Sequence, residues 1–439
     1  MALPSEPSRL GEKTPSHIPS LATVETTQYS IKPSILNGKV RVSGAKNSVL
    51  RLMAASILTP EAITLSNYPA TLRDAQVHTE MLKALGKSCD VSDTTLCITE
   101  TAALSTDLKW DGRSIRNTLL ILGALVARTG RGSVPLPGGC KLGERKHDLH
   151  VMLLEALGAR VWEEDGRLNA QASGGLQGAD IHLPIRSTGA TENALLCASL
   201  AQGTSTIWGP HIRPEIIDLI DFLTAMGADI TVYGQERIEV IGAQRLGGVK
   251  HRVMPDNMEA LTWLIGAVIT GGDVEIFDFP TKHLEVPLTF LRESGARFHV
   301  GDESLIVRGG TCYPVEISTG PYPGINSDMQ PLFAVYGACA RGQSRIVDLR
   351  FPGRYGYAEE LAKMGLLYSD DDNLLTIRGG ADFKGARVRA LDLRAGIALT
   401  LAALVADGET IIEDAWQIER GYDRIIPKLR ALGVDVSVR

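Results

Sequence analysis

The segment LEALGARVWE, residues 154–163, ends an amphipathic helical pattern on a glycine and continues as a strand. A glycine there is typical of a helix C-cap, because it adopts a left-handed backbone without steric penalty. The pattern occurs six times, with successive glycines 68 to 72 residues apart, which indicates one repeated supersecondary unit. The six copies are LKALGKSCDV (82–91), LEALGARVWE (154–163), LTAMGADITV (223–232), LRESGARFHV (291–300), LAKMGLLYSD (361–370) and LRALGVDVSV (429–438).

Each unit also contains a second helical pattern made almost entirely of small apolar residues. Alanine and leucine dominate it and charges are few, which predicts helices that are buried on all sides. Six units in 439 residues exceed one ordinary core. The pattern therefore predicts an α/β chain of two domains with three units each, helices inside and sheets outside. The expected buried helices cover residues 48–58, 117–128, 192–202, 258–270, 329–341 and 395–407.

Composition narrows the possible classes of function. The formal net charge of −6 at pH 7 argues against a general nucleic-acid binder. Six cysteines without CxxC spacing indicate a reducing, cytoplasmic location with no disulfide framework and no zinc site. Residues 1–28 are rich in Pro, Ser and Thr, which predicts a disordered tail rather than a secretory signal. No apolar run approaches the roughly 18 residues that a membrane span needs.

The starts of the six apolar helices are small or polar, and basic residues recur there. Lys46, Arg116 and Arg394 lie at or next to this position in three units. Free backbone N–H groups and the helix dipole make such an end attractive to anions. Symmetry would direct several of these ends into one cleft between the domains, so we expect an anion site there. Ordinary N-capping explains any one of these ends but not the recurring basic residue.

A thiol on a cationic loop is the second unusual feature. In LPGGCKLGERKHDLH (136–150), Cys140 follows two glycines and precedes Lys141. Neighbouring cations lower the pKa of a thiol, so proton donation and thiolate nucleophilicity would compete at Cys140. The glycines would allow the loop to fold over a cleft. An inert buried cysteine fits this context poorly, which makes Cys140 a candidate catalytic residue.

Taken together, these features resemble the enolpyruvyltransferase family over roughly residues 29–439. The resemblance implies a two-domain inside-out α/β barrel built from six βαβαββ units. Residues 46–255 would form one domain, and residues 29–45 with 256–439 the other. The stretches that carry the resemblance are VSGAKNSVLRLMAASIL (42–58), ALVARTGRGSVPLPGGCKLGERKHDLH (124–150), STGATEN (187–193), SDMQP (327–331), LDLRAG (391–396) and ERGYDRI (419–425).

The resemblance also implies addition–elimination chemistry on phosphoenolpyruvate, with no cofactor. An acceptor hydroxyl would attack C2 while C3 gains a proton, and phosphate would leave from the resulting ketal. This needs a cationic cradle, a group facing the hydroxyl and an acid near C3. The positions that match the family's catalytic pair are Cys140, as the acid, and Asp328, as the group facing the hydroxyl. Those that match its phosphoenolpyruvate site are Lys46, Asn47, Arg145, Arg354, Arg394 and Arg420.

On the acceptor side the chain departs from the pattern of the family members that act on UDP-N-acetylglucosamine. Residues 145–148 read Arg-Lys-His-Asp where those members show Arg-Pro-x-Asp, and PGRY (352–355) replaces Glu-Asn-Arg-Phe. A metal site at residues 147–150 is not expected, because no matching ligand set occurs elsewhere. The positions that the resemblance assigns to the acceptor are Arg116, Lys146, His147, Asp148, Leu149, Arg186, Ser187, Thr188 and Arg350.

Two enzymatic interpretations follow. In the first, the acceptor is the 3-hydroxyl of UDP-N-acetylglucosamine, which begins peptidoglycan precursor synthesis. In the second, a paralogue acts on the 3′-hydroxyl of UMP in nucleoside-antibiotic biosynthesis. A third interpretation, a non-catalytic nucleotide sensor, is disfavoured because both Cys140 and Asp328 are present. The expected partners are phosphoenolpyruvate and a uridine nucleotide, with neither a nucleic acid nor a membrane.

Overall fold

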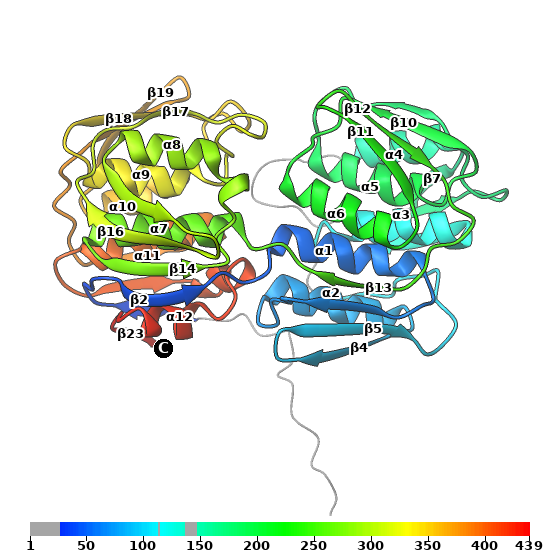
Figure 1. Cartoon of the computed structure of the whole chain (residues 1–439), viewed down its shortest axis with the longest axis horizontal. Coiled ribbons are helices and arrows are strands. Elements are labelled where there is room, and N and C mark those ends of the chain that lie inside the picture. The colour runs from blue at the N-terminus through cyan, green and yellow to red at the C-terminus, as the bar shows by residue number, and fades with distance from the viewer. Residues whose placement is uncertain (1–26, 113–114, 137–146) are drawn as a thin grey trace, which may run out of the picture.

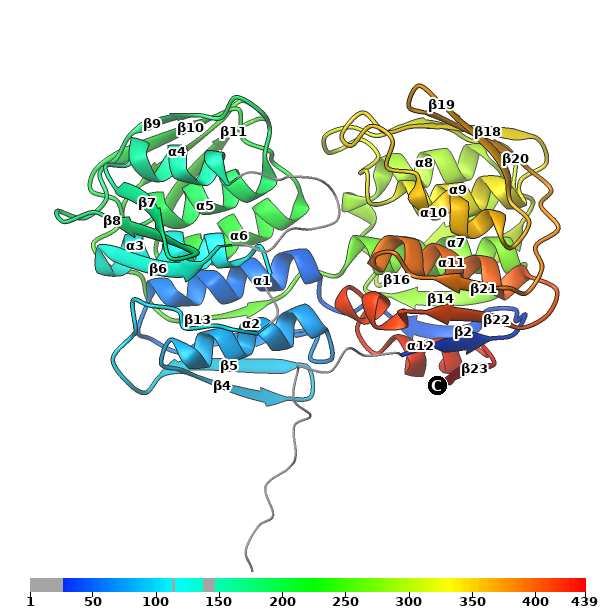
Figure 2. The same cartoon turned by 180° about the vertical axis from the view of Figure 1, so that it is seen from behind.

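The computed structural model describes residues 27–112, 115–136 and 147–439, which form two lobes side by side (Figures 1 and 2). Each lobe has its own hydrophobic core. One core draws on residues 49–253, and we call this part the N-lobe. The other draws on residues 29–42 and 258–436, and we call it the C-lobe. The start of the described chain therefore packs with its end.

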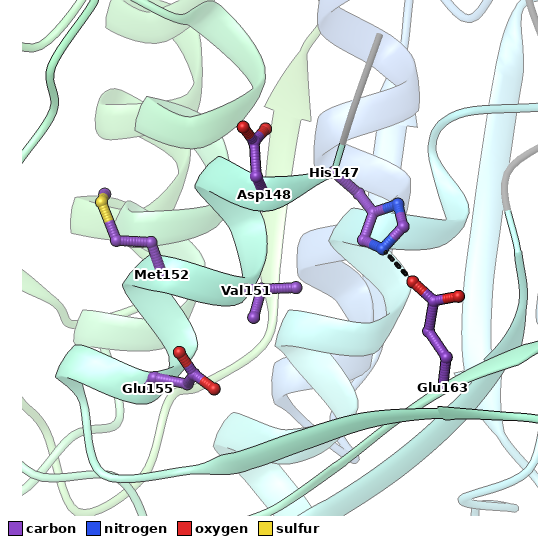
Figure 3. Close-up of a pocket in the computed structure, with 6 residues that line it drawn as sticks. All are labelled: His147, Asp148, Val151, Met152, Glu155 and Glu163. Carbon is purple, nitrogen blue, oxygen red and sulfur yellow. Dashed lines mark hydrogen bonds and ion pairs between the residues drawn. The ribbon is translucent and has the colours of Figure 1, made fainter. Parts of the chain in front are cut away.

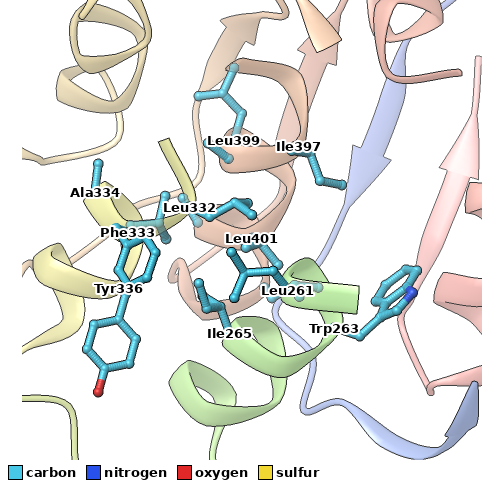
Figure 4. Packing of buried hydrophobic residues seen from close by; sticks show 14 of the residues in the cluster. Leu261, Trp263, Ile265, Leu332, Phe333, Ala334, Tyr336, Ile397, Leu399 and Leu401 are labelled. Carbon is cyan, nitrogen blue, oxygen red and sulfur yellow. The ribbon is translucent and has the colours of Figure 1, made fainter. Parts of the chain in front are cut away.

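Apolar helices lie at the centre of each lobe, as predicted. Figure 4 shows the three of the C-lobe in contact through side chains such as Leu261, Phe333 and Leu401, which are at most 1 % exposed. One N-lobe helix covers residues 188–198 instead of the expected 192–202. It starts four residues earlier because Ser187 caps it by accepting from the Ala190 N–H. The central helices are α1 (Lys46–Ala55, continued by η1, Ser56–Leu58), α3 (Thr118–Thr129), α5 (Thr188–Ala198), α7 (Asn257–Thr270), α9 (Gln330–Cys339) and α11 (Leu393–Val405).

A second set of helices follows the first strand of each unit. Each ends near the repeat glycine, and all six repeat glycines have φ between +88° and +113°, as a C-cap requires. The helices are α2 (Arg73–Ala84), α4 (Asp148–Ala156), α6 (Pro214–Ala225), α8 (Glu285–Glu293), α10 (Gly356–Ala362) and α12 (Ile425–Ala431), with two 3₁₀ turns, η2 (Thr281–His283) and η3 (Ala415–Arg420).

Mixed sheets form the outside of both lobes. In five of the six described sheets a parallel edge strand closes the sheet. The N-lobe sheets are β13 (Val249–Arg252)–β3 (Ile63–Ser66)–β5 (Thr95–Glu100)–β4 (Lys87–Ser92), β6 (Arg131–Pro135)–β8 (Arg167–Gln171)–β7 (Arg160–Glu164) and β11 (Asp229–Tyr233)–β12 (Arg237–Ile241)–β10 (Thr204–Trp208)–β9 (Asp180–His182). The C-lobe sheets are β15 (Ala296–Val300)–β16 (Ser304–Gly310)–β14 (Asp273–Phe277)–β2 (Asn37–Arg41), β17 (Glu316–Ser318)–β18 (Gln343–Val347)–β20 (Leu374–Arg378)–β19 (Leu367–Asp371) and β21 (Arg387–Arg389)–β22 (Thr410–Glu413)–β1 (Tyr29–Ile31)–β23 (Val436–Val438).

The chain crosses between the lobes at two adjacent places, near residues 43–46 and 253–256. The Ala45 N–H donates to the Met254 carbonyl (2.7 Å), and the Asp256 N–H donates to that of Ser43 (2.9 Å). The expected tail 1–28 lies outside the described residues up to residue 26, whereas Gln28 exchanges backbone hydrogen bonds with Arg439. Within the described ranges, no helix combines the length and the apolar character required to span a bilayer.

The repeat glycine allows a test of the C-cap. We expect Gly227→Ala to lower the free energy of unfolding by about 1–2 kcal/mol, because φ is +107° there while open space surrounds the position. Gly174→Ala is the matched control, since its surroundings are equally open and its φ is not in the left-handed region. Urea unfolding of both variants measures the difference, and equal midpoints would contradict the interpretation.

Candidate active site

One cationic cluster lies where α1 begins, next to the crossings. Lys46 is the first residue of α1, and its Nζ lies 2.9 Å from Asp74 Oδ2 on α2. Arg420, from η3 of the C-lobe, places its Nε 3.2 Å from the other oxygen, Asp74 Oδ1. The side chains of Lys46 and Asp74 are 13 % and 4 % exposed. Cations from both lobes therefore meet at one buried carboxylate.

A second cluster lies in the C-lobe, at the starts of α9 and α11. Asp328 accepts from Arg354 Nη1 (2.7 Å), and its other oxygen lies 3.3 Å from Arg394 Nη2. Asp392 caps α11 and accepts from the Arg394 backbone N–H (2.7 Å). Arg394 is 4 % exposed, yet its Nε and Nη1 have no partner in the described structure. Buried donors without acceptors are costly, so this guanidinium is suited to binding a carboxylate.

The second cluster influences the protonation of the first. Burial alone would raise the pKa of Asp328, but the charges of Arg394 and Arg354 outweigh it and hold the pKa of this carboxyl well below its usual range. Burial lowers the pKa of Lys46, Asp74 opposes this, and Arg420 and Arg394 add to the lowering. Because Arg394 acts on both Asp328 and Lys46, the clusters belong to one electrostatic site.

Asp348 holds the loop that carries Asp328. Its buried carboxylate accepts from Ser327 Oγ (2.5 Å) and Thr319 Oγ1 (2.7 Å), and from the Arg350 backbone N–H (2.9 Å). The segments before α9 and after β18 are thereby tied to one acceptor. Asp348 acts on the site through these neighbours. No interaction among the described residues joins it directly to Asp328.

His147, Asp148 and Leu149 lie where α4 begins, with His147 as N-cap. Two of them border a surface hollow of about 500 Å³. In Figure 3 the ring of His147 points toward Glu163, with 2.8 Å between Nε2 and Oε1, while the Asp148 carboxylate points away from that pair. The residues lining the hollow are His147, Asp148, Val151, Met152, Glu155 and Glu163.

Ser187 and Thr188 begin α5 and lie beside His211. Thr188 Oγ1 is 2.9 Å from His211 Nδ1, and His211 Nε2 is buried with no partner in the described structure. Burial lowers the pKa of His211 to about 4, and the charges of three arginines contribute. One of the three, Arg350, comes from the C-lobe, so charges from both lobes act on this imidazole. The three arginines are Arg186, Arg213 and Arg350.

The remaining predicted positions divide into two groups. Asn47 follows Lys46 on α1 and is half-buried, and Arg116 precedes α3 with its charge acting on His150 of α4. The second group, Cys140, Arg145 and Lys146, lies outside the described residues.

Sequence reasoning missed Asp74, Asp348, His211 and Arg213. Asp74 and Asp348 resemble ordinary polar residues at element ends in the sequence, and their partners are distant along the chain. Arg213 precedes Pro214 at the start of α6, which reads as a common helix start. Only His211 offered a signal, as a histidine shortly before a helix start, and that signal is weak.

Comparison with known proteins decides the family. Residues 31–429 match the family described as EPSP synthase (3-phosphoshikimate 1-carboxyvinyltransferase). The UDP-N-acetylglucosamine 1-carboxyvinyltransferase of Zymomonas mobilis is 39 % identical over 412 residues, 92 % of this chain and 96 % of the relative. That of Thermus thermophilus is 39 % identical over 406 residues, 92 % and 95 % of the two chains. The chain belongs to the carboxyvinyltransferase family.

Solved structures agree with the sequence relatives of this carboxyvinyltransferase. The enolpyruvyl transferase NikO from Streptomyces tendae superposes with a TM-score of 0.85 at 26 % identity, covering 94 % of this chain and 99 % of NikO. An EPSP synthase from Acinetobacter baumannii shares the fold, with a TM-score of 0.73 at 18 % identity over 94 % of this chain and 100 % of the other. The predicted family and the predicted inside-out α/β fold are confirmed.

The surroundings of His211 lead to a titration test. Because burial and three nearby arginines lower its pKa to about 4, we expect the imidazole to stay neutral from pH 6 to 8. NMR of protein labelled with ¹³C-histidine measures this, with the signal assigned by its loss in His211→Gln. A midpoint above pH 6 for that signal would show that the ring is hydrated rather than buried among cations.

Proposed function

We propose that this carboxyvinyltransferase transfers the enolpyruvyl group of phosphoenolpyruvate to the 3-hydroxyl of UDP-N-acetylglucosamine and releases phosphate. The observation that carries the proposal is the buried guanidinium of Arg394. Arg394 is 4 % exposed and lies next to Asp328, and its Nε and Nη1 have no partner among the described residues. A planar guanidinium in this state suits a substrate carboxylate. The Lys46–Arg420 cluster suits the phosphate of the same substrate.

In the proposed mechanism, the substrate makes Asp328 a better base. The phosphoenolpyruvate carboxylate would bind Arg394 and Arg354, the two groups that now hold the pKa of Asp328 far down. Sharing these cations with a second anion weakens their hold on Asp328 and returns its pKa toward the usual range. The base would thus become effective when the enolpyruvate is in place.

The proton transfers then proceed in two stages. Asp328 accepts the proton of the acceptor hydroxyl, the hydroxyl oxygen forms a bond to C2, and Cys140 donates a proton to C3. The tetrahedral ketal then loses phosphate from C2, and the Cys140 thiolate takes back a proton from C3, which restores the vinyl ether. Asp328 releases its proton to the departing phosphate, so both groups return to their starting states. Lys46 and Arg420, with Arg145, would stabilise the charge on the departing phosphate. Cys140 and Arg145 enter this scheme from their sequence motif.

Most of the described residues proposed for the nucleotide lie at or next to the starts of α3, α4 and α5 in the N-lobe, and Arg350 follows β18 in the C-lobe. Relatives named for UDP-N-acetylglucosamine and 39 % identical over 92 % of the chain support that acceptor. Its product would enter peptidoglycan synthesis. The proposed acceptor-binding residues are Arg116, Lys146, His147, Asp148, Leu149, Arg186, Ser187, Thr188 and Arg350.

A second candidate acceptor is UMP. Three arginines act on the imidazole of His211, whose Nε2 is buried and has no partner in the part of the chain that the structure describes. Positive charge concentrated at one point suits a terminal phosphate, which carries up to two negative charges on one group, better than the singly charged phosphates of a nucleotide sugar.

Phosphate release by the purified protein tests the proposal. We expect release from phosphoenolpyruvate only when a uridine nucleotide is added, fastest with UDP-N-acetylglucosamine. Faster release with UMP would select the second candidate. Both candidates would be refuted if only shikimate 3-phosphate supported release, or if none of the three acceptors did.

The role of Asp328 leads to a substitution test. We expect Asp328→Asn to lower kcat by about 10²–10⁴-fold, because the amide cannot take the hydroxyl proton. The KM for phosphoenolpyruvate should stay equal or fall, since Arg394 and Arg354 lose a competing anion. Steady-state phosphate release measures both constants. Asp273→Asn, which removes an exposed carboxylate 3.8 Å from Arg308, is the control and should leave them unchanged.

A further inference from the structure

Several polar contacts join the two lobes beside the Lys46 cluster, and we call this set of contacts the seam. Each contact links the region of α2 and β4 in the N-lobe with η3 or the turn after it in the C-lobe. The seam contacts are Arg73–Glu419 (2.6 Å), Asp74–Arg420 (3.2 Å), Thr71–Asp423 (backbone N–H to Oδ1, 2.9 Å) and Asp93–Arg424 (2.6 Å).

Two consecutive seam pairs have opposite polarity. Arg73 is the cation of the first pair and Glu419 its anion, whereas Asp74 is the anion of the second and Arg420 its cation. The pairs differ in burial, because the side chains of Arg73 and Glu419 are 22 % and 25 % exposed and that of Asp74 is 4 % exposed. Asp74 also contacts Lys46. The second pair therefore belongs both to the seam and to the candidate active site.

The Asp74 carboxylate contacts both cations at once. Oδ2 lies 2.9 Å from Lys46 Nζ and 3.5 Å from Arg420 Nη2, and Oδ1 lies 3.2 Å from Arg420 Nε. The two cations come from different lobes, and Asp74 holds them close enough for the oxygens of a single oxyanion to contact both. Without this anion, the two positive groups would repel each other in a site with little water to screen them.

The charge of Lys46 depends on the same carboxylate. Burial is the main factor that lowers the pKa of Lys46, and Asp74 is the main group that opposes it. Arg420 and Arg394 face the ammonium from the C-lobe and add to the lowering. Asp256, from the second crossing, accepts from the Lys46 backbone N–H at 3.1 Å.

We propose that Asp74 is a positioning residue that keeps Lys46 charged and holds it beside Arg420 across the seam, so that one phosphate group binds both. The inference rests on the proposed function in taking that phosphate to be the one that phosphoenolpyruvate carries and releases. Asp74 itself contacts no substrate atom. It acts through Lys46 and Arg420, and it couples the relative position of the lobes to phosphate binding.

Binding of inorganic phosphate, measured by calorimetry from pH 7 to 10, tests this role. Binding weakens as Lys46 loses its proton, so it falls with rising pH. In Asp74→Asn we expect the midpoint of that fall about 1–3 pH units below the wild-type midpoint, which is the range of shift that one close opposite charge produces. Asp74→Glu, which retains the charge, should bring the midpoint back toward the wild-type value.

Glu419→Gln is the matched control, because it removes the neighbouring seam pair and leaves Lys46 and Asp74 in place. Its midpoint should equal that of the wild type. An unchanged midpoint in Asp74→Asn, an equal shift in Glu419→Gln, or no phosphate binding by the wild type would overturn the proposal. If Asp74→Asn does not fold, Asp74→Glu decides. A wild-type midpoint in Asp74→Glu supports the role of the carboxylate, and the absence of any pH midpoint in that variant refutes it. Phosphate binding requires no acceptor and no turnover, so a failure of the proposed function is detected separately, by the release assay.

Discussion

Three apolar helices packed in the centre of each lobe leave little room for charge on their sides, and the arrangement of the site follows from this constraint. A Cβ added at Gly266 of α7 would lie 2.8 Å from Leu36 Cδ1, and the charges on the sides of α1 and α5, Arg51 and Glu192, form an ion pair with each other. The first charged groups therefore appear at or next to the N-termini, at Lys46, Asp328 and Arg394. Free backbone N–H groups and the helix dipole point outward at the same ends.

Charges in such positions are expensive unless they are paired. Lys46 is paired with Asp74, and Asp328 with Arg354, but Arg394 retains two buried donors without partners in the described structure. The site therefore contains buried hydrogen-bond donors that no acceptor among the described residues satisfies. An anionic substrate supplies the missing acceptors, so binding is driven by relief of a cost already present in the fold.

The two lobes contribute to this site unequally and are joined where the charges meet. The crossings near residues 43–46 and 253–256 lie beside Lys46, and the seam adds ionic contacts from α2 to η3. A change in the angle between the lobes must therefore alter the distance between Lys46 and Arg420. Lobe orientation and charge at the site form one coupled system, in which Asp74 is the shared member.

The sequence alone determined the six units, the buried helices, the two lobes and the basic residues at the helix starts. These features are encoded locally, because a C-cap glycine or an apolar helix is recognisable within about ten residues. Tertiary structure alone decided that Asp74 bridges Lys46 and Arg420, that Asp348 holds the loop before α9, and that the charge of Arg350 acts on His211 from the other lobe. Asp74 and Arg420 are 346 residues apart, and no local pattern records which distant charge neutralises a given carboxylate. Burial and pairing depend on the packed whole, because the surroundings that set the energy of a charge exist only once the lobes have formed.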